Sequence, residues 1–398
     1  MHSHNLKTSL SGALDYTYTP ETAELETLSP FSISAFVRQD GNIGIRNDIW
    51  IIPTVGCVNG IAKILAEKTG ALCFTHPYGC SQLGDDLSVT QKTLSGLIRH
   101  PNAGGVLVLG LGCENNNIAE LKKALGKLND ERIRFLNCQD YEDEIAQGIS
   151  IIKELQAIAD KDRRETVPVS KLKIGLKCGG SDGLSGITAN PMCGRITDKT
   201  VAMGGTAILT EVPEMFGAEQ LLMNRCINET VFNKTVNLIN NYKNYFIAHH
   251  QPVSENPSPG NKAGGITTLE EKSLGCVQKG GNAPITAVLS YGDTAERPGL
   301  NLLDGPGNDM VAVTNLTAAG CHLILFTTGR GTPLGAPVPT VKIATNTSLA
   351  ERKKSWIDFD AQSGTDESLL KLIREAANGK KQKTNSTELV KSLFIKTV

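Results

Sequence analysis

The sequence predicts an α/β fold with two or more Rossmann-like parallel-sheet units, in which glycine-rich loops lie at the carboxyl ends of the strands. Two observations carry this prediction. Short apolar runs alternate with stretches of helical periodicity, which is the pattern of strands joined by crossover helices. Many apolar runs end in a turn rich in glycine, of which the chain has 40, and such turns bring backbone close to a small ligand.

The first predicted domain covers residues 36–165, and the polar segment 1–35, which lacks periodicity, is expected to form a mobile N-terminal arm. The strands of this domain are expected at 49–55, 71–75, 105–109 and 133–136. Each strand is followed by a stretch that predicts a helix, at 61–68, 89–99, 118–125 and 142–159. A charged run then indicates a solvated linker, which we take as the domain boundary.

The second predicted domain covers residues 166–398 and begins with the same rhythm. Its strands are expected at 172–177, 206–212, 288–291 and 322–328, and its main helices at 194–203 and 218–245. The segment 249–262 is rich in proline, serine and asparagine and predicts an exposed loop. Both halves contain a strand, a cysteine-bearing turn, a helix and a second strand in this order, which indicates two related units.

The composition is that of an ordinary globular chain of 398 residues, 40% hydrophobic and 20% charged. A net charge of −1 argues against nucleic acid or a membrane surface as a partner, and 5% aromatic residues argue against base stacking. No apolar stretch spans a bilayer and no apolar signal core is present, so we expect a cytoplasmic protein. The ten cysteines include no Cys-x-x-Cys pair, which argues against a zinc ribbon.

Three cysteines each follow a run that is expected to end a strand: Cys80, Cys113 and Cys178. Strand ends are where open α/β sheets place their chemistry, and a thiolate there can bind a metal or attack an electrophile. His76 lies four residues before Cys80 and is a candidate ligand, although a lone histidine is as often structural. Cys113 and Glu114 precede three asparagines that favour a helix start, and a helix N-terminus stabilises a thiolate.

One glycine-rich hexapeptide is the most site-like part of the sequence. Its Gly179, Gly180 and Ser181 offer backbone N–H groups that suit a carboxylate or phosphate. It lacks the Gly-Lys-Ser/Thr of a P-loop, so it does not predict a nucleotide site. Glu211 and Glu214 bracket a proline after a strand, as base and ligand or, in the structural alternative, as helix caps.

Further charged side chains lie on glycine loops of the second domain. Lys279 and Arg330 are cations of the kind that hold substrate carboxylates, and Asp304 and Asp309 flank a Gly-Pro-Gly-Asn turn. Thiols, carboxylates and cations on such loops predict a metal-assisted reaction on a small polyanionic or polyhydroxylated substrate.

The same motifs resemble those of the altronate/galactarate dehydratase family of sugar-acid dehydratases, over roughly residues 36–360. The resemblance rests on Arg38-Gln-Asp-Gly, Gly44-Ile-Arg-Asn, His76-Pro-Tyr-Gly-Cys, Gly110-Leu-Gly-Cys-Glu, Lys177-Cys-Gly-Gly-Ser-Asp, Glu211-Val-Pro-Glu, Leu303-Asp-Gly-Pro-Gly-Asn-Asp and Gly329-Arg-Gly-Thr-Pro. It implies a hydro-lyase that uses ferrous iron to convert D-altronate to 2-dehydro-3-deoxy-D-gluconate and water. The alternatives are a galactarate dehydratase, the large subunit of a sulfolactate sulfo-lyase, which eliminates sulfite, and a non-catalytic sugar-acid-binding scaffold subunit.

The resemblance and the chemistry together assign expected roles to the candidate residues. Cys80, Cys113 and Cys178 would hold the iron, with His76 or Glu114 as a further ligand. The alternatives are that the three thiolates hold an iron–sulfur cluster instead, or that the ion is another divalent metal such as Mn²⁺.

The substrate is expected to contact a second set of residues, namely Gly179, Gly180, Ser181, Asp304, Asp309 and Arg330. Lys279 would neutralise its carboxylate, and the base at C2 would be Glu211, Glu214 or Asp182, between which the sequence does not choose. Single-chain members of the family carry an N-terminal SAF-type domain, for which residues 1–35 are too short. We therefore expect a separate small SAF-type subunit and an oligomer.

Overall fold

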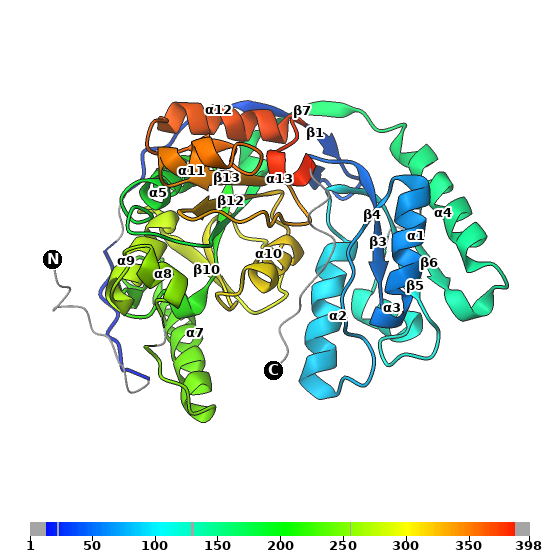
Figure 1. The fold of residues 1–398 in the computed structure, drawn as a ribbon, viewed down its shortest axis with the longest axis horizontal. Coiled ribbons are helices and arrows are strands. Elements are labelled where there is room, and N and C mark those ends of the chain that lie inside the picture. The colour runs from blue at the N-terminus through cyan, green and yellow to red at the C-terminus, as the bar shows by residue number, and fades with distance from the viewer. Residues whose placement is uncertain (1–12, 22–23, 129–130, 255, 387–398) are drawn as a thin grey trace.

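The computed structural model describes residues 13–21, 24–128, 131–254 and 256–386, and it confirms the predicted α/β architecture (Figure 1). It contains two parallel sheets, of four and seven strands, and a three-stranded antiparallel sheet. Among the described helices, none is long and apolar enough to cross a lipid bilayer.

The smaller parallel sheet and its helices comprise β3 (Asp48–Pro53), β4 (Leu72–Cys73), β5 (Ala103–Gly110), β6 (Ile133–Asn137), α1 (Asn59–Thr69), α2 (Gly84–Ile98), α3 (Ile118–Leu125) and α4 (Glu144–Ala159). The strand order is β4-β3-β5-β6, all parallel. Successive side chains of a strand point to opposite faces. Ile49 and Ile51 of β3 therefore pack with α1 and α4, whereas Trp50 and Ile52 pack with α2 and α3.

The larger sheet consists of β8 (Lys173–Cys178), β9 (Thr206–Leu209), β10 (Ile285–Leu289), β11 (Gly299–Leu303), β12 (Leu323–Thr328), β13 (Thr340–Ala344) and β14 (Phe359–Asp360). Its order is β10-β11-β9-β8-β12-β13-β14, and all neighbouring strands are parallel. All six residues of β12 are buried, as expected for a strand with both faces covered. β8 lies in the middle of this sheet, so its carboxyl end is flanked by those of β9 and β12.

The remaining helices are α5 (Ala189–Ala202), α6 (Glu219–Met223), α7 (Glu229–Ala248), α8 (Pro259–Ala263), α9 (Leu269–Val277), α10 (Asp309–Ala318), α11 (Thr347–Arg352), α12 (Asp366–Ala377) and α13 (Lys383–Ser386). Short 3₁₀ turns occur at η1 (Gly56–Val58), η2 (Cys138–Asp140), η3 (Val169–Lys171), η4 (Val212–Glu214) and η5 (Gln278–Gly280). The helix predicted over 218–245 is interrupted, because Asn228 begins α7 by accepting a hydrogen bond from the Val231 N–H.

The two parallel sheets share one hydrophobic core, which lies between α2 and α10 (Figure 1). Leu94 and Leu97 of α2 belong to the same buried cluster as Val313 and Leu316 of α10. Gly96 allows this close approach, because a Cβ atom there would lie 2.3 Å from the Ala318 carbonyl oxygen. The contact fixes the two sheets relative to each other.

The antiparallel sheet, β1 (Ser32–Val37), β2 (Ile43–Gly44) and β7 (Arg164–Pro168), has β1 at its centre. The described residues before β1 lie against the second part of the chain. Tyr16 Oη donates to Glu219 at 2.7 Å, and Tyr18 Oη donates to the Cys226 carbonyl at 2.8 Å. Residues 1–12 of the predicted arm lie outside the described residues.

Candidate active site

The candidate active site lies at the carboxyl edge of the seven-stranded sheet, where β8 ends at Cys178. The turn after β8 depends on glycine, because a Cβ atom on Gly179 would lie 2.5 Å from an Asp309 carboxylate oxygen and Gly180 has a φ of +61°. Glu211, after β9, also has a positive φ, of 72°, which is uncommon for a residue with a side chain. Such a conformation at a strand end suits a residue that is placed for function.

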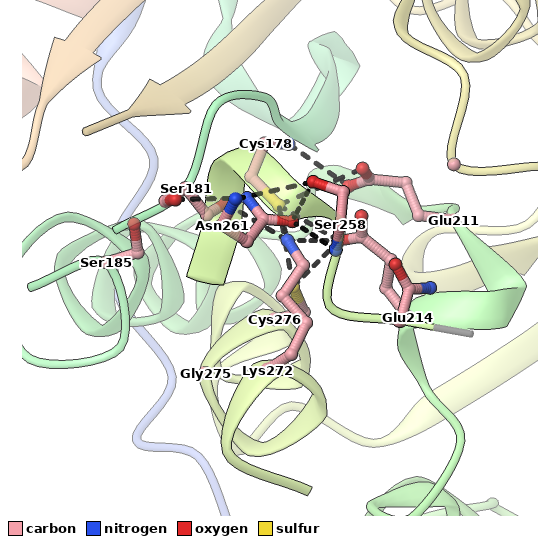
Figure 2. A network of polar contacts seen from close by, with 12 residues as sticks. Cys178, Ser181, Ser185, Glu211, Glu214, Ser258, Asn261, Lys272, Gly275 and Cys276 are labelled. Carbon is pink, nitrogen blue, oxygen red and sulfur yellow. Dashed lines mark hydrogen bonds and ion pairs between the residues drawn. The ribbon is translucent and has the colours of Figure 1, made fainter. Parts of the chain in front are cut away.

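Cys178 is the centre of a buried polar cluster (Figure 2). Its sulfur lies 3.0 Å from Lys279 Nζ, 3.2 Å from a Glu214 carboxylate oxygen and 3.5 Å from the Cys276 sulfur. The Cys276 sulfur in turn lies 2.8 Å from the same Glu214 oxygen. Thiols and carboxylates from three separate segments of the chain therefore meet at one point.

Three lysines neutralise the cluster. Lys177 pairs with Glu211 and lies 2.8 Å from Asp309, and Lys279 reaches the other Glu211 oxygen at 3.1 Å. The third, Lys272, lies 3.0 Å from Glu214. The side chains of all three lysines are at most 3% exposed, so these charges depend on one another for solvation.

The pKa values of the two sulfurs are shifted in opposite directions. The hydrogen bond from Cys276 and the ammonium groups of Lys272 and Lys279 hold the pKa of Cys178 well below its usual range, against the effect of burial. The same hydrogen bond and burial raise the pKa of Cys276 well above its usual range. The lowered pKa favours the thiolate form of Cys178, which is the form of cysteine that acts as nucleophile, ligand or base.

Glu211 is poised to hold a proton near neutral pH. Burial and the negative charges of Cys178 and Glu214 raise the pKa of Glu211 to about 8, against the pull of Lys177 and Lys279. A carboxylic acid with its pKa in this range can both donate and accept a proton at physiological pH.

Cys178, Glu214 and Cys276 form the one group among the described residues whose metal-ligand atoms all lie within 4.8 Å of one another. Two sulfurs and a carboxylate could hold a metal ion, and iron is compatible with such donors. Lys279 and Lys272 already lie 3.0 Å from two of these donor groups. A divalent ion would have to displace both ammonium groups, so the arrangement is that of a lysine-stabilised thiolate and not of a preformed metal site.

The other predicted metal ligands lie on the four-stranded sheet. His76 is buried, and its two ring nitrogens meet the Pro53 carbonyl at 2.8 Å and the Tyr78 N–H at 3.2 Å. Glu114 accepts hydrogen bonds from the Leu111 and Gly112 N–H groups at 3.1 and 2.7 Å. Both side chains thus brace their own loops.

Cys80 and Cys113 are exposed and lie on adjoining loops. The Ser81 N–H, next to Cys80, donates to Asn115 Oδ1 at 2.7 Å. The structure therefore brings Cys80 and Cys113 into one neighbourhood, at the edge of a different sheet from Cys178.

The remaining predicted residues surround the Cys178 turn in different ways. Asp182 is held by Thr345 and Asn346, at 3.0 and 3.1 Å, and Ser181 accepts a hydrogen bond from Lys272 at 3.1 Å. Arg330 is exposed and donates to the Gly260 carbonyl. The side chain of Asp309 is 33% exposed, so it marks the open side of the cluster.

Sequence reasoning missed Lys177, Lys272 and Cys276. Lys177 directly precedes Cys178 at the end of an apolar strand. A charged residue is unexpected at such a buried position, so Lys177 could have been recognised as a site residue from the sequence. Cys276 lies in the same glycine-bounded segment as Lys279, whereas Lys272 carries no local sign of its role.

Comparison with known proteins gives matches to two family models. The model described as "D-galactarate/Altronate dehydratase, C-terminal" matches residues 169–397, and "D-galactarate dehydratase/Altronate hydrolase, second domain" matches residues 35–160. The chain is 55% identical over 373 residues to the altronate dehydratase of Escherichia coli, which covers 91% of this chain and 75% of that protein.

Two further relatives are less similar. The chain is 34% identical to the galactarate dehydratase (L-threo-forming) of Escherichia coli, over 86% of this chain and 69% of that protein. It is 31% identical to the (2R)-sulfolactate sulfo-lyase subunit beta of Chromohalobacter salexigens, over 90% of this chain and 95% of that subunit.

Proposed function

The chain belongs to the D-galactarate/altronate dehydratase family and is a sugar-acid dehydratase, and from this premise we propose that it converts D-altronate to 2-dehydro-3-deoxy-D-gluconate and water. The support for altronate is the gradient of similarity, from 55% identity to an altronate dehydratase to 34% to a galactarate dehydratase. The support for the site is the buried cluster of thiolate, carboxylates and lysines at the edge of the larger sheet.

Loss of water from a 2,3-dihydroxy acid needs a base at C2, an acid at the C3 hydroxyl and positive charge near the developing enediolate. We assign the acid to Glu211, because burial and the neighbouring negative charges raise its pKa to about 8, so that this carboxylate can take up and release a proton near neutral pH. Lys177 and Lys279, on either side of Glu211, supply the positive charge. Preorganised charge of this kind is worth about 3–4 kcal/mol per interaction in the transition state.

The base is assigned to Glu214. Asp182, the other candidate, already accepts hydrogen bonds from Thr345 and Asn346, which suits a brace for the turn. Glu214 faces the Cys178 thiolate and borders Gly307, and its residue is 8% exposed, the most open of the two cluster glutamates. Asp309 and Arg330 lie towards solvent and would contact the hydroxyl and carboxylate groups of the substrate.

Iron(II) is proposed as the metal of the enzyme, with Mn²⁺ as the alternative. When bound, such an ion supplies a Lewis acid for the carboxylate and the departing hydroxyl. The donors Cys178, Glu214 and Cys276 match iron in kind, but Lys272 and Lys279 compete with it at the same atoms. The acid and base steps above therefore involve the chain's own residues alone.

A separate small SAF-type subunit and an oligomeric assembly are also proposed. The supporting observation is that a protein named as a subunit, the sulfo-lyase subunit beta, matches this chain over 95% of its own length. Residues from such a partner would complete the site on its open side, near Asp309.

The test is an anaerobic assay of 2-keto acid formation from D-altronate with added iron(II), with and without a co-expressed SAF-type subunit. We expect keto acid from D-altronate, slower turnover of galactarate by at least tenfold, and no sulfite from sulfolactate. If keto acid forms only when the SAF-type subunit is co-expressed, part of the site lies on that subunit. Sulfite release without keto acid would overturn the dehydratase assignment for altronate.

A further inference from the structure

Three of the ten cysteines are exposed, and all three lie at the same edge of the four-stranded sheet: Cys57, Cys80 and Cys113. They follow β3, β4 and β5, which are neighbouring parallel strands. Free cysteine is among the most buried residue types, and most of the other seven are buried here. Three exposed thiols at one edge therefore need an explanation other than packing.

Backbone hydrogen bonds tie the three loops together next to the cysteines. The Gly56 N–H, adjacent to Cys57, donates to the Tyr78 carbonyl at 2.9 Å. The Asn116 N–H donates to the Gly79 carbonyl, adjacent to Cys80, at 3.0 Å. The Cys80 loop is thus hydrogen-bonded to the loop that carries Cys57 and to the loop that carries Cys113.

The Cys80 loop is held in a conformation that a free surface loop does not need. Gly79 has a φ of +102°, and a Cβ atom there would lie 2.1 Å from the Thr54 carbonyl oxygen. Ser81, on the other side of Cys80, has a φ of 57°, which is uncommon for a residue with a side chain. Strained residues on both sides of one exposed thiol indicate that its position is functional.

The buried side chains His76 and Glu114 support the same edge. His76 bonds the Pro53 carbonyl at the end of β3, and Glu114 bonds the two amides that precede Cys113. His76 and Glu114 therefore hold the loops that carry the thiols, and the thiols are the groups available to ligate a metal. The contacts of the sulfurs are long and come from neutral groups, as in the 3.7 Å contact between Gln139 Nε2 and Cys113.

The spacing of the three sulfurs bears on whether they would bind a single metal ion or a cluster of several. A single tetrahedral ion with metal–sulfur bonds of about 2.3 Å holds its sulfurs roughly 3.8 Å apart. Among the described residues, Cys57, Cys80 and Cys113 do not form a group with all ligand atoms within 4.8 Å. Three thiols on loops that are bonded to one another, but not gathered around one point, suit an iron–sulfur cluster, in which each thiolate ligates a different iron.

We propose that Cys57, Cys80 and Cys113 ligate an iron–sulfur cluster at the carboxyl edge of the four-stranded sheet, with one iron left open for a substrate or partner oxygen. Ligation converts the three thiols to thiolates and releases their protons to solvent. The proposal places the iron away from the lysine-neutralised Cys178, and it does not depend on altronate being the substrate.

The test is anaerobic reconstitution of the full chain with iron(II) and sulfide, followed by iron and acid-labile sulfide analysis and visible absorption. We expect about four iron and four sulfide per chain, with a broad thiolate-to-iron absorption band. Cys57→Ser, Cys80→Ser and Cys113→Ser should each lower both contents at least fivefold. Cys138→Ser, at the end of the neighbouring strand β6, and Cys178→Ser should retain them.

Alkylation mapping gives a second readout that does not require the variants to fold. Iodoacetamide should modify Cys57, Cys80 and Cys113 in the metal-free chain, and reconstitution should protect all three at least tenfold. One iron per chain without sulfide would overturn the cluster in favour of a single ion. Unchanged iron and sulfide in the three serine variants, or no protection, would overturn the site itself. Because none of these readouts uses turnover, they are separate from the test of the proposed reaction.

Discussion

At the scale of single residues, the buried lysines define the chemistry of the candidate active site. Removing a lysine from water costs several kcal/mol unless it is paired, and three such residues meet around Cys178 and Glu211. Although burial opposes it, the carboxylates of Glu211 and Asp309 hold the pKa of Lys177 above its usual range. Apolar side chains could fill this buried region without the cost of removing charges from water. The charged cluster therefore indicates a function rather than a stabilising role.

A matched pair of lysine substitutions separates function from stability. Lys279→Met should lower kcat by at least 100-fold, because it removes positive charge beside Glu211 and Cys178. Lys243→Met removes another fully buried ion pair, with Glu219 at 2.6 Å, away from the cluster. Each should lower the free energy of unfolding by about 3–5 kcal/mol, measured in urea. Equal turnover by the two folded variants would contradict the role given to Lys279.

At the scale of elements, glycines decide how closely helices approach. Gly96 of α2 lies against the backbone of α10, where a Cβ atom would meet the Ala318 carbonyl oxygen at 2.3 Å. A Cβ atom added to Gly60 of α1 would have no neighbouring atom within 4 Å. A side chain should therefore be unfavourable at Gly96 and favourable at Gly60, although both are glycines within helices.

The same substitution should thus have opposite signs at the two positions. Gly60→Ala should stabilise the protein by about 0.5–1 kcal/mol, because alanine favours the helix and meets no neighbour. Gly96→Ala should destabilise it by about 1–3 kcal/mol, because α2 and α10 must separate. Urea unfolding of both variants measures these changes. A stabilising Gly96→Ala would show that the two helices are not in fixed contact.

At the scale of the whole molecule, two buried histidines lie where the sheets meet. His100 follows α2, and its Nε2 lies 3.1 Å from the Cys321 carbonyl, just before β12. His322 Nδ1 accepts from the Lys173 N–H of β8 at 2.9 Å. Burial lowers the pKa of both histidines to about 3. Both rings are therefore neutral in the folded protein throughout the physiological range.

These histidines predict how stability depends on pH. Between about pH 6.5 and 3 the unfolded chain binds protons that the folded chain does not, so stability is complete above pH 6.5 and falls as pH falls. Each group contributes a slope of about 1.4 kcal/mol per pH unit in this window. Urea unfolding at pH 7, 6 and 5 should show a shallower slope for His100→Phe than for the unsubstituted chain. The exposed control His249→Gln should leave the slope unchanged.

Much of the fold and part of the site could be read from local pattern. Apolar runs and glycine turns located several of the strands, and they placed Cys178 and Glu211 each at the end of a strand, where the structure brings the two together. The strands β13 and β14 and the break between α6 and α7 depend on neighbours that are distant in sequence. Local pattern carries little of that information, because such pairing is decided by long-range packing.

The sequence by itself determined the α/β class, the family and the loops that carry chemistry, because periodicity and motifs are local properties of the chain. Only the tertiary structure decided which loops share a site. It joined Lys272 and Cys276 to Cys178, and it placed Cys80 and Cys113 with Cys57 on another sheet. The physical reason is that a strand's residues predict a strand end, whereas the sheet that the strand enters depends on pairing and burial across the whole molecule.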